Sequence, residues 1–175
     1  MKTDINKKKI EKILDKSVAY NIIQNHDGIN YITDGYCMWL DHEKLFDGME
    51  RYFYLKEEIK ENKNNLKITT EYMVEEYLQS YDYVKADEFE KCVLVSDLPR
   101  RKQNEKEYKT EKTKNVLLKN GDFYKLINQK YYDTFDKECN FLIATQFVMV
   151  FVTNKEGSLI GIIAPLNDNN SHIEK

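Results

Sequence analysis

The chain has few of the residues that build catalytic, metal or disulfide sites. Its 175 residues include three histidines and three cysteines. Cys37, Cys92 and Cys139 lie far apart without a CxxC pair, and their odd number argues against a disulfide framework. No histidine is spaced from another histidine or a cysteine as metal ligands are, and no Walker, GxSxG, HExxH or GxGxxG motif occurs. The sequence therefore predicts a non-enzymatic protein without a cofactor or metal.

Long hydrophobic runs, proline and glycine are also scarce. The most apolar stretch, 141–152, is too short for a membrane span and contains Thr145 and Gln146. No signal peptide is visible in the sequence, so we expect a soluble protein of the reducing cytoplasm that does not contact membranes. A length of 175 residues fits one domain, or two small ones, with a sizeable core. Two prolines and six glycines beside 13 tyrosines and eight phenylalanines favour an ordered α+β protein, which we expect to be a single domain over residues 1–175.

Two pairs of apolar runs predict antiparallel strands. Residues 29–46 read INYITDGYCMWLDHEKLF, and the Asp-Gly dipeptide at 34–35 favours a tight turn because glycine adopts positive φ without steric cost. The only tryptophan, Trp39, follows this turn, so we expect the centre of the core there. The runs 141–152 and 158–166 predict a second hairpin.

Two amphipathic helices are predicted, one near the start of the chain and one in its second half. Residues 4–19, capped by Asp4, and residues 122–135, capped by Asp122, carry apolar side chains at helical spacing. The same spacing occurs at 70–81. The fold expected from these patterns is α+β, an antiparallel sheet backed by two amphipathic helices.

Charge is segregated along the chain, although its net value is only −3. Residues 1–20 carry six lysines and three acids, 41–91 carry fourteen acids and eight bases, and 100–114 carry seven bases and three acids. Such asymmetry can mark separate binding faces, and a solvated surface of mixed charge is the alternative. Residues 100–114, whose one apolar residue is Tyr108, are also predicted to form a mobile loop, and 167–175 a frayed tail.

Two sets of candidate binding residues follow from the charge pattern. Bases on the two predicted helices and the basic loop can neutralise phosphates without reading base sequence. The candidate DNA-binding residues are Lys9, Lys12, Lys16, Arg100, Arg101, Lys102, Lys125 and Lys130. The acidic, tyrosine-rich middle offers a protein partner large contact area at low entropy cost. Its candidate partner-binding residues are Glu71, Tyr72, Glu75, Glu76, Tyr81 and Tyr83.

The segment Ile32-Thr33-Asp34-Gly35-Tyr36 is similar to the ATDGHR segment of sliding-clamp domains, and 158–166 resembles the strand that closes the last domain of a clamp. On these segments the chain resembles one domain of the sliding-clamp family, which includes the bacterial β clamp and PCNA. The resemblance implies two helices backed by antiparallel sheet, with the second helix at 122–135. The acidic segment at about 49–115 would be an insertion into that domain.

The same resemblance implies a phage or mobile-element protein that acts on DNA-processing machinery. The lysine-bearing helices would face DNA, a replication protein would be a partner, and strand edges would join chains into a homo-oligomer. A second hypothesis is a phage-borne inhibitor of a host defence nuclease, of the anti-CRISPR type, whose acidic surface mimics nucleic acid. A third is a structural or scaffolding domain. Salt-sensitive DNA binding distinguishes the first hypothesis, and tight binding to a basic nuclease distinguishes the second.

Overall fold

Most of the chain that the structure describes is β-strand. The computed structural model describes residues 4–17, 20–24, 30–40, 45–49, 52, 82–102, 105–145, 149–166 and 171–174. Two short helices lie in these ranges, α1 (Lys7–Leu14) and α4 (Gln129–Tyr132). The strands are β1 (Asn21–Gln24), β2 (Asn30–Thr33), β3 (Cys37–Leu40), β4 (Tyr83–Lys85), β5 (Glu88–Lys102), β6 (Glu105–Asn120), β7 (Phe123–Asn128), β8 (Asn140–Ala144), β9 (Val150–Thr153), β10 (Leu159–Ile163) and β11 (Ser171–Glu174). The expected antiparallel sheet is present, and the two described helices are shorter than the two amphipathic helices of the α+β prediction.

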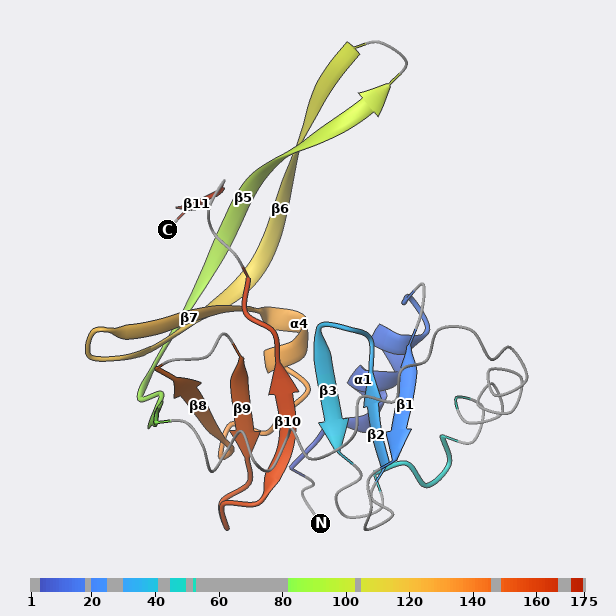
Figure 1. Cartoon of the computed structure of the whole chain (residues 1–175), viewed down its shortest axis with the longest axis vertical. Coiled ribbons are helices and arrows are strands. Elements are labelled where there is room, and N and C mark those ends of the chain that lie inside the picture. The colour runs from blue at the N-terminus through green and yellow to red at the C-terminus, as the bar shows by residue number, and fades with distance from the viewer. Residues whose placement is uncertain are drawn as a thin grey trace.

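The larger sheet has seven antiparallel strands in the order β1-β2-β3-β10-β9-β8-β4 (Figure 1). The first predicted hairpin is confirmed, because β2 pairs with β3. The second is confirmed in part: β9 pairs with β10, but the run 141–152, predicted as one strand, contributes to two strands, β8 and β9. The two hairpins join through the pairing of β3 with β10, where Trp39 is the partner of Gly161. Trp39 is fully buried at this junction, so the core is centred where the sequence predicts it.

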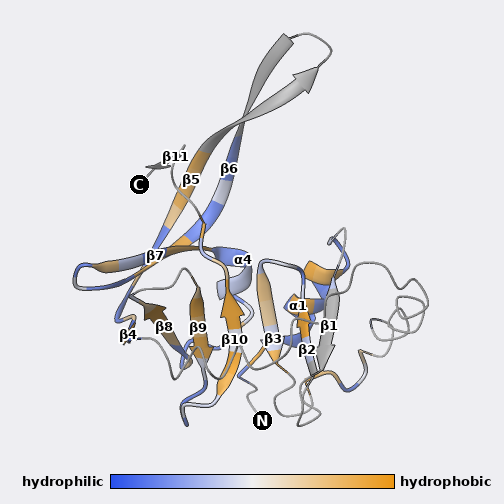
Figure 2. Ribbon diagram, in the orientation of Figure 1, coloured by the Kyte–Doolittle hydropathy of each residue, from blue (hydrophilic) through white to orange (hydrophobic). Residues whose placement is uncertain are grey.

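Both faces of this sheet bury apolar side chains. Along β8, Phe141 and Ile143 belong to the main core, whereas Leu142 and Ala144 belong to a smaller cluster. Because successive side chains in a strand point to opposite faces, the two clusters lie on opposite sides of the sheet. Strands buried on both faces read as continuous apolar runs, and β8, β9 and β10 are hydrophobic along most of their length (Figure 2).

The second sheet has four strands in the order β11-β5-β6-β7, and its β5–β6 hairpin rises from the body of the protein (Figure 1). The pairing of β5 with β6 runs from Glu88↔Lys119 to Lys102↔Glu105. The predicted mobile loop is therefore wrong over 100–102 and 105–114, since these residues lie in β5 and β6. β11 pairs with residues 93–96 of β5, and beyond them β5 and β6 continue as a ribbon of two paired strands. The sequence of this ribbon shows no alternation of apolar and polar residues, so it gave no signal for a strand. The frayed tail is also wrong over 171–174, which form β11.

The first helix is shorter than predicted. It spans Lys7–Leu14 rather than 4–19, and its N-cap is Asn6, whose side chain accepts a hydrogen bond from the backbone N of Lys9 at 3.2 Å. Asp4 lies outside the helix because the next residue, Ile5, forms a β-bridge with Phe135. The helix packs its apolar side on the main core.

The second predicted helix, 122–135, is wrong over most of its length. Residues 123–128 are the strand β7, and only the single turn of α4 is helical. The cause is the Asn120-Gly121 turn, in which Gly121 has a φ of +56° and reverses the chain after β6. Asn-Gly turns strongly favour hairpins, so pairing with β6 overrides the helical spacing. The helix predicted at 70–81 lies outside the described residues, and none of the helices in the described ranges is long and apolar enough to cross a membrane.

Candidate functional site

One side of α1 carries a stripe of lysines. Lys9, Lys12 and Lys16 are three and four residues apart, which places them one above another along the helix and the turn that follows it. All three are exposed, because Ile10 and Leu14 hold another side of the helix against the core. The sequence of α1 therefore fixes a row of ammonium groups at the surface.

The chain around α4 forms a wall next to this stripe. The segment before α1 is fastened to the segment after α4, since the backbone N of Asn6 donates to the backbone O of Thr134 at 2.7 Å. The Nζ of Lys9 also donates to the backbone O of Asp133 at 2.8 Å. These contacts bring Lys130 of α4 to the side of α1 that carries the lysines.

The turn between β2 and β3 supplies the third wall. Its Asp34 accepts hydrogen bonds at Oδ1 from the backbone N of Tyr36 and of Cys37, each at 3.0 Å, around Gly35 with a φ of +92°. The Oδ2 of Asp34 accepts a hydrogen bond from the hydroxyl of Tyr131 at 2.7 Å. Both carboxylate oxygens are thus engaged within the protein, and the turn exposes 65% of Tyr36.

Together α1, this turn and α4 enclose a groove of about 650 Å³, which we call the lysine groove. Its lining residues are Lys9, Lys12, Ile13, Lys16, Ser17, Asp34, Tyr36, Lys130, Tyr131 and Asp133. Four lysines face two aspartates, and Lys12 and Lys16 form no ion pair among the described residues. The groove is therefore positive although the chain carries a net charge of −3.

Tyr131 connects the lysine groove to the core. The ring centroids of Tyr131 and Trp39 lie 6.2 Å apart. The Nζ of Lys130 lies 4.4 Å from the ring centroid of Tyr131. Burial raises the pKa of Tyr131, and the hydrogen bond to Asp34 and the charge of that carboxylate raise it further. The phenol of the folded protein thus stays protonated, and keeps donating to Asp34, at pH values where a free tyrosine ionises.

We expect this shift to make Tyr131 a source of instability in alkali. The unfolded phenol has a pKa of 10.0, and the folded one a higher pKa, so the contribution of Tyr131 is fully present below pH 10 and decreases as the pH rises above it. Tyr131→Phe should be less stable than the wild type at about pH 8, because the Oδ2 of Asp34 loses the hydrogen bond that the phenol donates. Its free energy of unfolding should nevertheless fall less steeply between about pH 9 and 11. Urea unfolding across that range gives the free energy of unfolding of both proteins as a function of pH. Parallel slopes for the two proteins would contradict a raised pKa of Tyr131 in the folded state.

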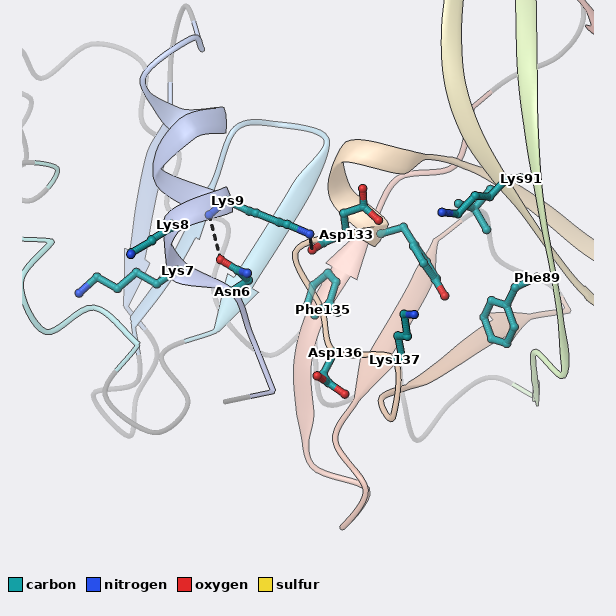
Figure 3. Close-up of a pocket in the computed structure, with 12 residues that line it drawn as sticks. Asn6, Lys7, Lys8, Lys9, Phe89, Lys91, Asp133, Phe135, Asp136 and Lys137 are labelled. Atoms are coloured by element: carbon teal, nitrogen blue, oxygen red, sulfur yellow. Dashed lines mark hydrogen bonds between the residues drawn. The ribbon is translucent and has the colours of Figure 1, made fainter. Parts of the chain in front are cut away.

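A second hollow, which we call the aromatic hollow, adjoins the lysine groove and shares Lys9 and Asp133 with it. Its volume is about 800 Å³. Its lining residues are Asn6, Lys7, Lys8, Lys9, Phe89, Lys91, Val116, Tyr132, Asp133, Phe135, Asp136 and Lys137. Figure 3 shows Lys9 on one side of the hollow, Phe89 and Lys91 on the other, and Lys137 between them.

The structure brings together half of the predicted DNA-binding residues. Lys9, Lys12, Lys16 and Lys130 line the lysine groove. Lys125 lies on β7 as the partner of Leu118 and lines neither hollow. The other three, Arg100, Arg101 and Lys102, lie at the far end of β5, where their register partners on β6 are Glu107, Lys106 and Glu105.

The predicted partner-binding surface falls almost entirely outside the described residues. Tyr83 is its one described member, lies on the edge strand β4 and is 45% exposed. The remaining members, Glu71, Tyr72, Glu75, Glu76 and Tyr81, lie outside the described residues.

Sequence reasoning missed the residues on the far side of the aromatic hollow. Phe89 and Lys91 are two residues apart in β5, and residues two apart in a strand share a face, so this alternation is the signal that could have found them. Lys137 carries no such signal, because its position depends on the path of the chain after α4.

The cysteines are not part of either hollow. Cys37, Cys92 and Cys139 are free and buried, and burial raises the pKa of each thiol, that of Cys139 to about 11. Within the described ranges, no three histidine, cysteine, aspartate or glutamate side chains are grouped in a way that could hold a metal ion.

No protein-family model, curated protein or solved structure matches this chain. The resemblance to a sliding-clamp domain therefore stays a prediction from the sequence. The function has to be argued from the groove and the hollow themselves.

Proposed function

We propose that this chain is a non-enzymatic binding protein that takes the phosphate backbone of a nucleic acid into the lysine groove. The observation that supports the proposal is the convergence of Lys9, Lys12 and Lys16, from α1 and the turn after it, with Lys130 from α4. Among the described residues these lysines form no ion pair, so no described pair has to be broken before an anion binds in the groove.

The residue types in the groove suit phosphate contacts rather than base reading. Lysine offers a compact charge with three donors, which meets phosphate oxygens without demanding one geometry. The hydroxyl and ring of exposed Tyr36 add a polar and a flat contact at the rim. Such contacts position a nucleic acid without specifying its sequence, and their strength falls as salt rises.

We further propose, from the resemblance in the sequence, that the chain is a clamp-like phage or mobile-element protein that acts on DNA-processing machinery. Association into a homo-oligomer would use free strand edges, and among the described strands β1 and β4 are the edges of the larger sheet. The inhibitor hypothesis depends on candidate residues in the acidic middle, of which Tyr83 is the one that the structure describes, so no described contact favours it. The binding experiment below can also detect the behaviour that this hypothesis predicts.

The first test compares nucleic-acid binding by the wild type and by Lys12→Gln/Lys16→Gln. Anisotropy of a labelled DNA strand is titrated at about 50 and 200 mM salt, and we expect wild-type affinity to fall steeply between the two. Removing two lysines that contact phosphate should weaken binding at low salt and reduce the slope of log affinity against log salt by about two.

The matched control is Lys85→Gln/Lys114→Gln. Both lysines are exposed and line neither hollow, so this variant makes the same charge change elsewhere and should bind like the wild type. Equal losses in the two variants would mean that net charge rather than the groove controls binding. No DNA binding by the wild type, with tight binding to a basic nuclease, would replace the proposal by the inhibitor hypothesis.

A further inference from the structure

The aromatic hollow presents an exposed ring that is held in place by a buried one. Phe89 on β5 is 44% exposed, yet its ring lies 5.9 Å from Tyr132 and 5.8 Å from Phe141. Tyr132 stacks on Phe141 with centroids 5.0 Å apart and planes at 28°, and Phe141 is 1% exposed. A flat ligand that stacks on Phe89 would therefore restrict little additional side-chain motion, which favours binding.

Cations surround this ring cluster. Lys8, Lys91 and Lys137 are exposed, line the hollow and form no ion pair among the described residues. Figure 3 shows Lys91 on the same side of the hollow as Phe89, away from α1, and Lys137 between Phe89 and α1. The volume of about 800 Å³ lies in the range of small-ligand sites. Aromatic rings bordered by lysines are the combination with which proteins hold single-stranded nucleic acids.

We propose that the aromatic hollow binds an unpaired nucleotide, with its base against Phe89 and Tyr132 and its phosphates toward Lys91 and Lys137. This inference rests on the proposed function and makes it more specific: the nucleic acid in the lysine groove is single-stranded at this protein. Lys9 lines both the groove and the hollow, so one strand can pass directly from the first to the second.

Duplex nucleic acid does not fit this arrangement. In a duplex each base is covered on both faces by its neighbours, and a base reaches a protein ring only when the strand is open or the nucleotide is turned out. The lysine groove alone would accept either form, because both carry phosphates. The aromatic hollow is what distinguishes them. Its stacking chemistry is common to DNA and RNA, so the test includes both.

The decisive experiment uses the full chain and strands of about twelve nucleotides, a length within the range that single-strand sites cover. Binding is measured for a labelled DNA strand, the RNA strand of the same sequence, the DNA duplex, and a DNA strand that has the same phosphates but no bases. We expect at least one intact single strand to bind more tightly than the duplex. The strand without bases should bind about 10-fold more weakly than the intact strand, because it cannot stack.

Phe89→Ala should reduce affinity for the intact single strand by about 10-fold and leave binding of the strand without bases unchanged. Phe89→Leu retains an apolar side chain but no aromatic face, and should also bind the intact strand more weakly than the wild type. Phe123→Ala is the matched control, because Phe123 is equally 44% exposed, lies on β7 and lines neither hollow. The control should bind like the wild type.

The outcomes separate this inference from the proposed function. If wild-type protein binds strands with and without bases equally, or prefers the duplex, the nucleotide site is wrong, while a loss in Lys12→Gln/Lys16→Gln keeps the phosphate groove. Equal losses in Phe89→Ala and Phe123→Ala also overturn the nucleotide site. If no strand binds at about 50 mM salt, the proposed function itself fails. Should Phe89→Ala not fold, the comparison of strands with and without bases on the wild type decides.

Discussion

Replacing Phe141 by alanine is expected to remove about 3–5 kcal/mol of the free energy of unfolding. Phe141 lies on β8, is 1% exposed, and contacts the rings of Phe89, Tyr132 and Phe135. Alanine would remove the ring that these three share and leave a cavity between the sheet and the chain around α4. The substitution should also weaken single-strand binding, because Phe89 would lose the ring that holds it.

Urea unfolding followed by the emission of Trp39, the only tryptophan, measures this loss. Phe141→Leu is the control, since leucine retains much of the apolar volume, and it should lose about half as much or less. A loss below about 1 kcal/mol for the alanine variant would contradict the position of Phe141 at the centre of the core.

Gly161→Ala should destabilise the protein by about 2–3 kcal/mol, although it adds a single methyl group. A Cβ at this position of β10 would lie 2.5 Å from Cε1 of Phe135 and 3.2 Å from the backbone O of Met38. The ring of Phe135 cannot withdraw easily, because it is 6% exposed and packs edge-on against Phe141 at 6.1 Å. Glycine is therefore required here by the close approach of a ring to the sheet.

A double-mutant cycle tests this explanation. In a Phe135→Leu background the added methyl group has room, so Gly161→Ala should cost less than about 1 kcal/mol there. Thermal or urea unfolding of the wild type, both single variants and the double variant gives the coupling energy. Additive losses would mean that another contact of Gly161 is responsible.

The parts of the fold that the sequence predicts are those with a buried face. The runs that became β8, β9 and β10 are apolar because both faces of their sheet are covered, and α1 shows helical spacing because Ile10 and Leu14 reach the core. The outer part of the β5–β6 hairpin was not predicted because its sequence shows no apolar alternation. The strand β7 was not predicted, because the spacing of its apolar residues also fits a helix. The Asn120-Gly121 turn, which favours a hairpin with β6, decides between the two structures.

The candidate site was predictable only in part, for a similar reason. The stripe formed by Lys9, Lys12 and Lys16 is a local property of one helix, so the sequence alone gives it. Lys130 lies beside the lysines of α1 because of tertiary contacts such as the hydrogen bond from the backbone N of Asn6 to the backbone O of Thr134. No local sequence pattern predicts such a contact. The aromatic hollow combines residues of α1, β5 and the chain after α4, and this combination exists only in the folded protein.

The pairing of β3 with β10 also has a consequence for the time course of folding. At about 5–20 residues per second, a ribosome releases β3 on the order of ten seconds before β10 is made. During that interval the strand that carries Trp39 lacks the neighbour that it has in the finished sheet, and an unpaired apolar edge invites other chains to pair with it. α4 is also made well after α1, so the lysine groove can form only late in synthesis. We therefore expect each newly made chain to be most exposed to aggregation before the strands that complete its larger sheet have been made.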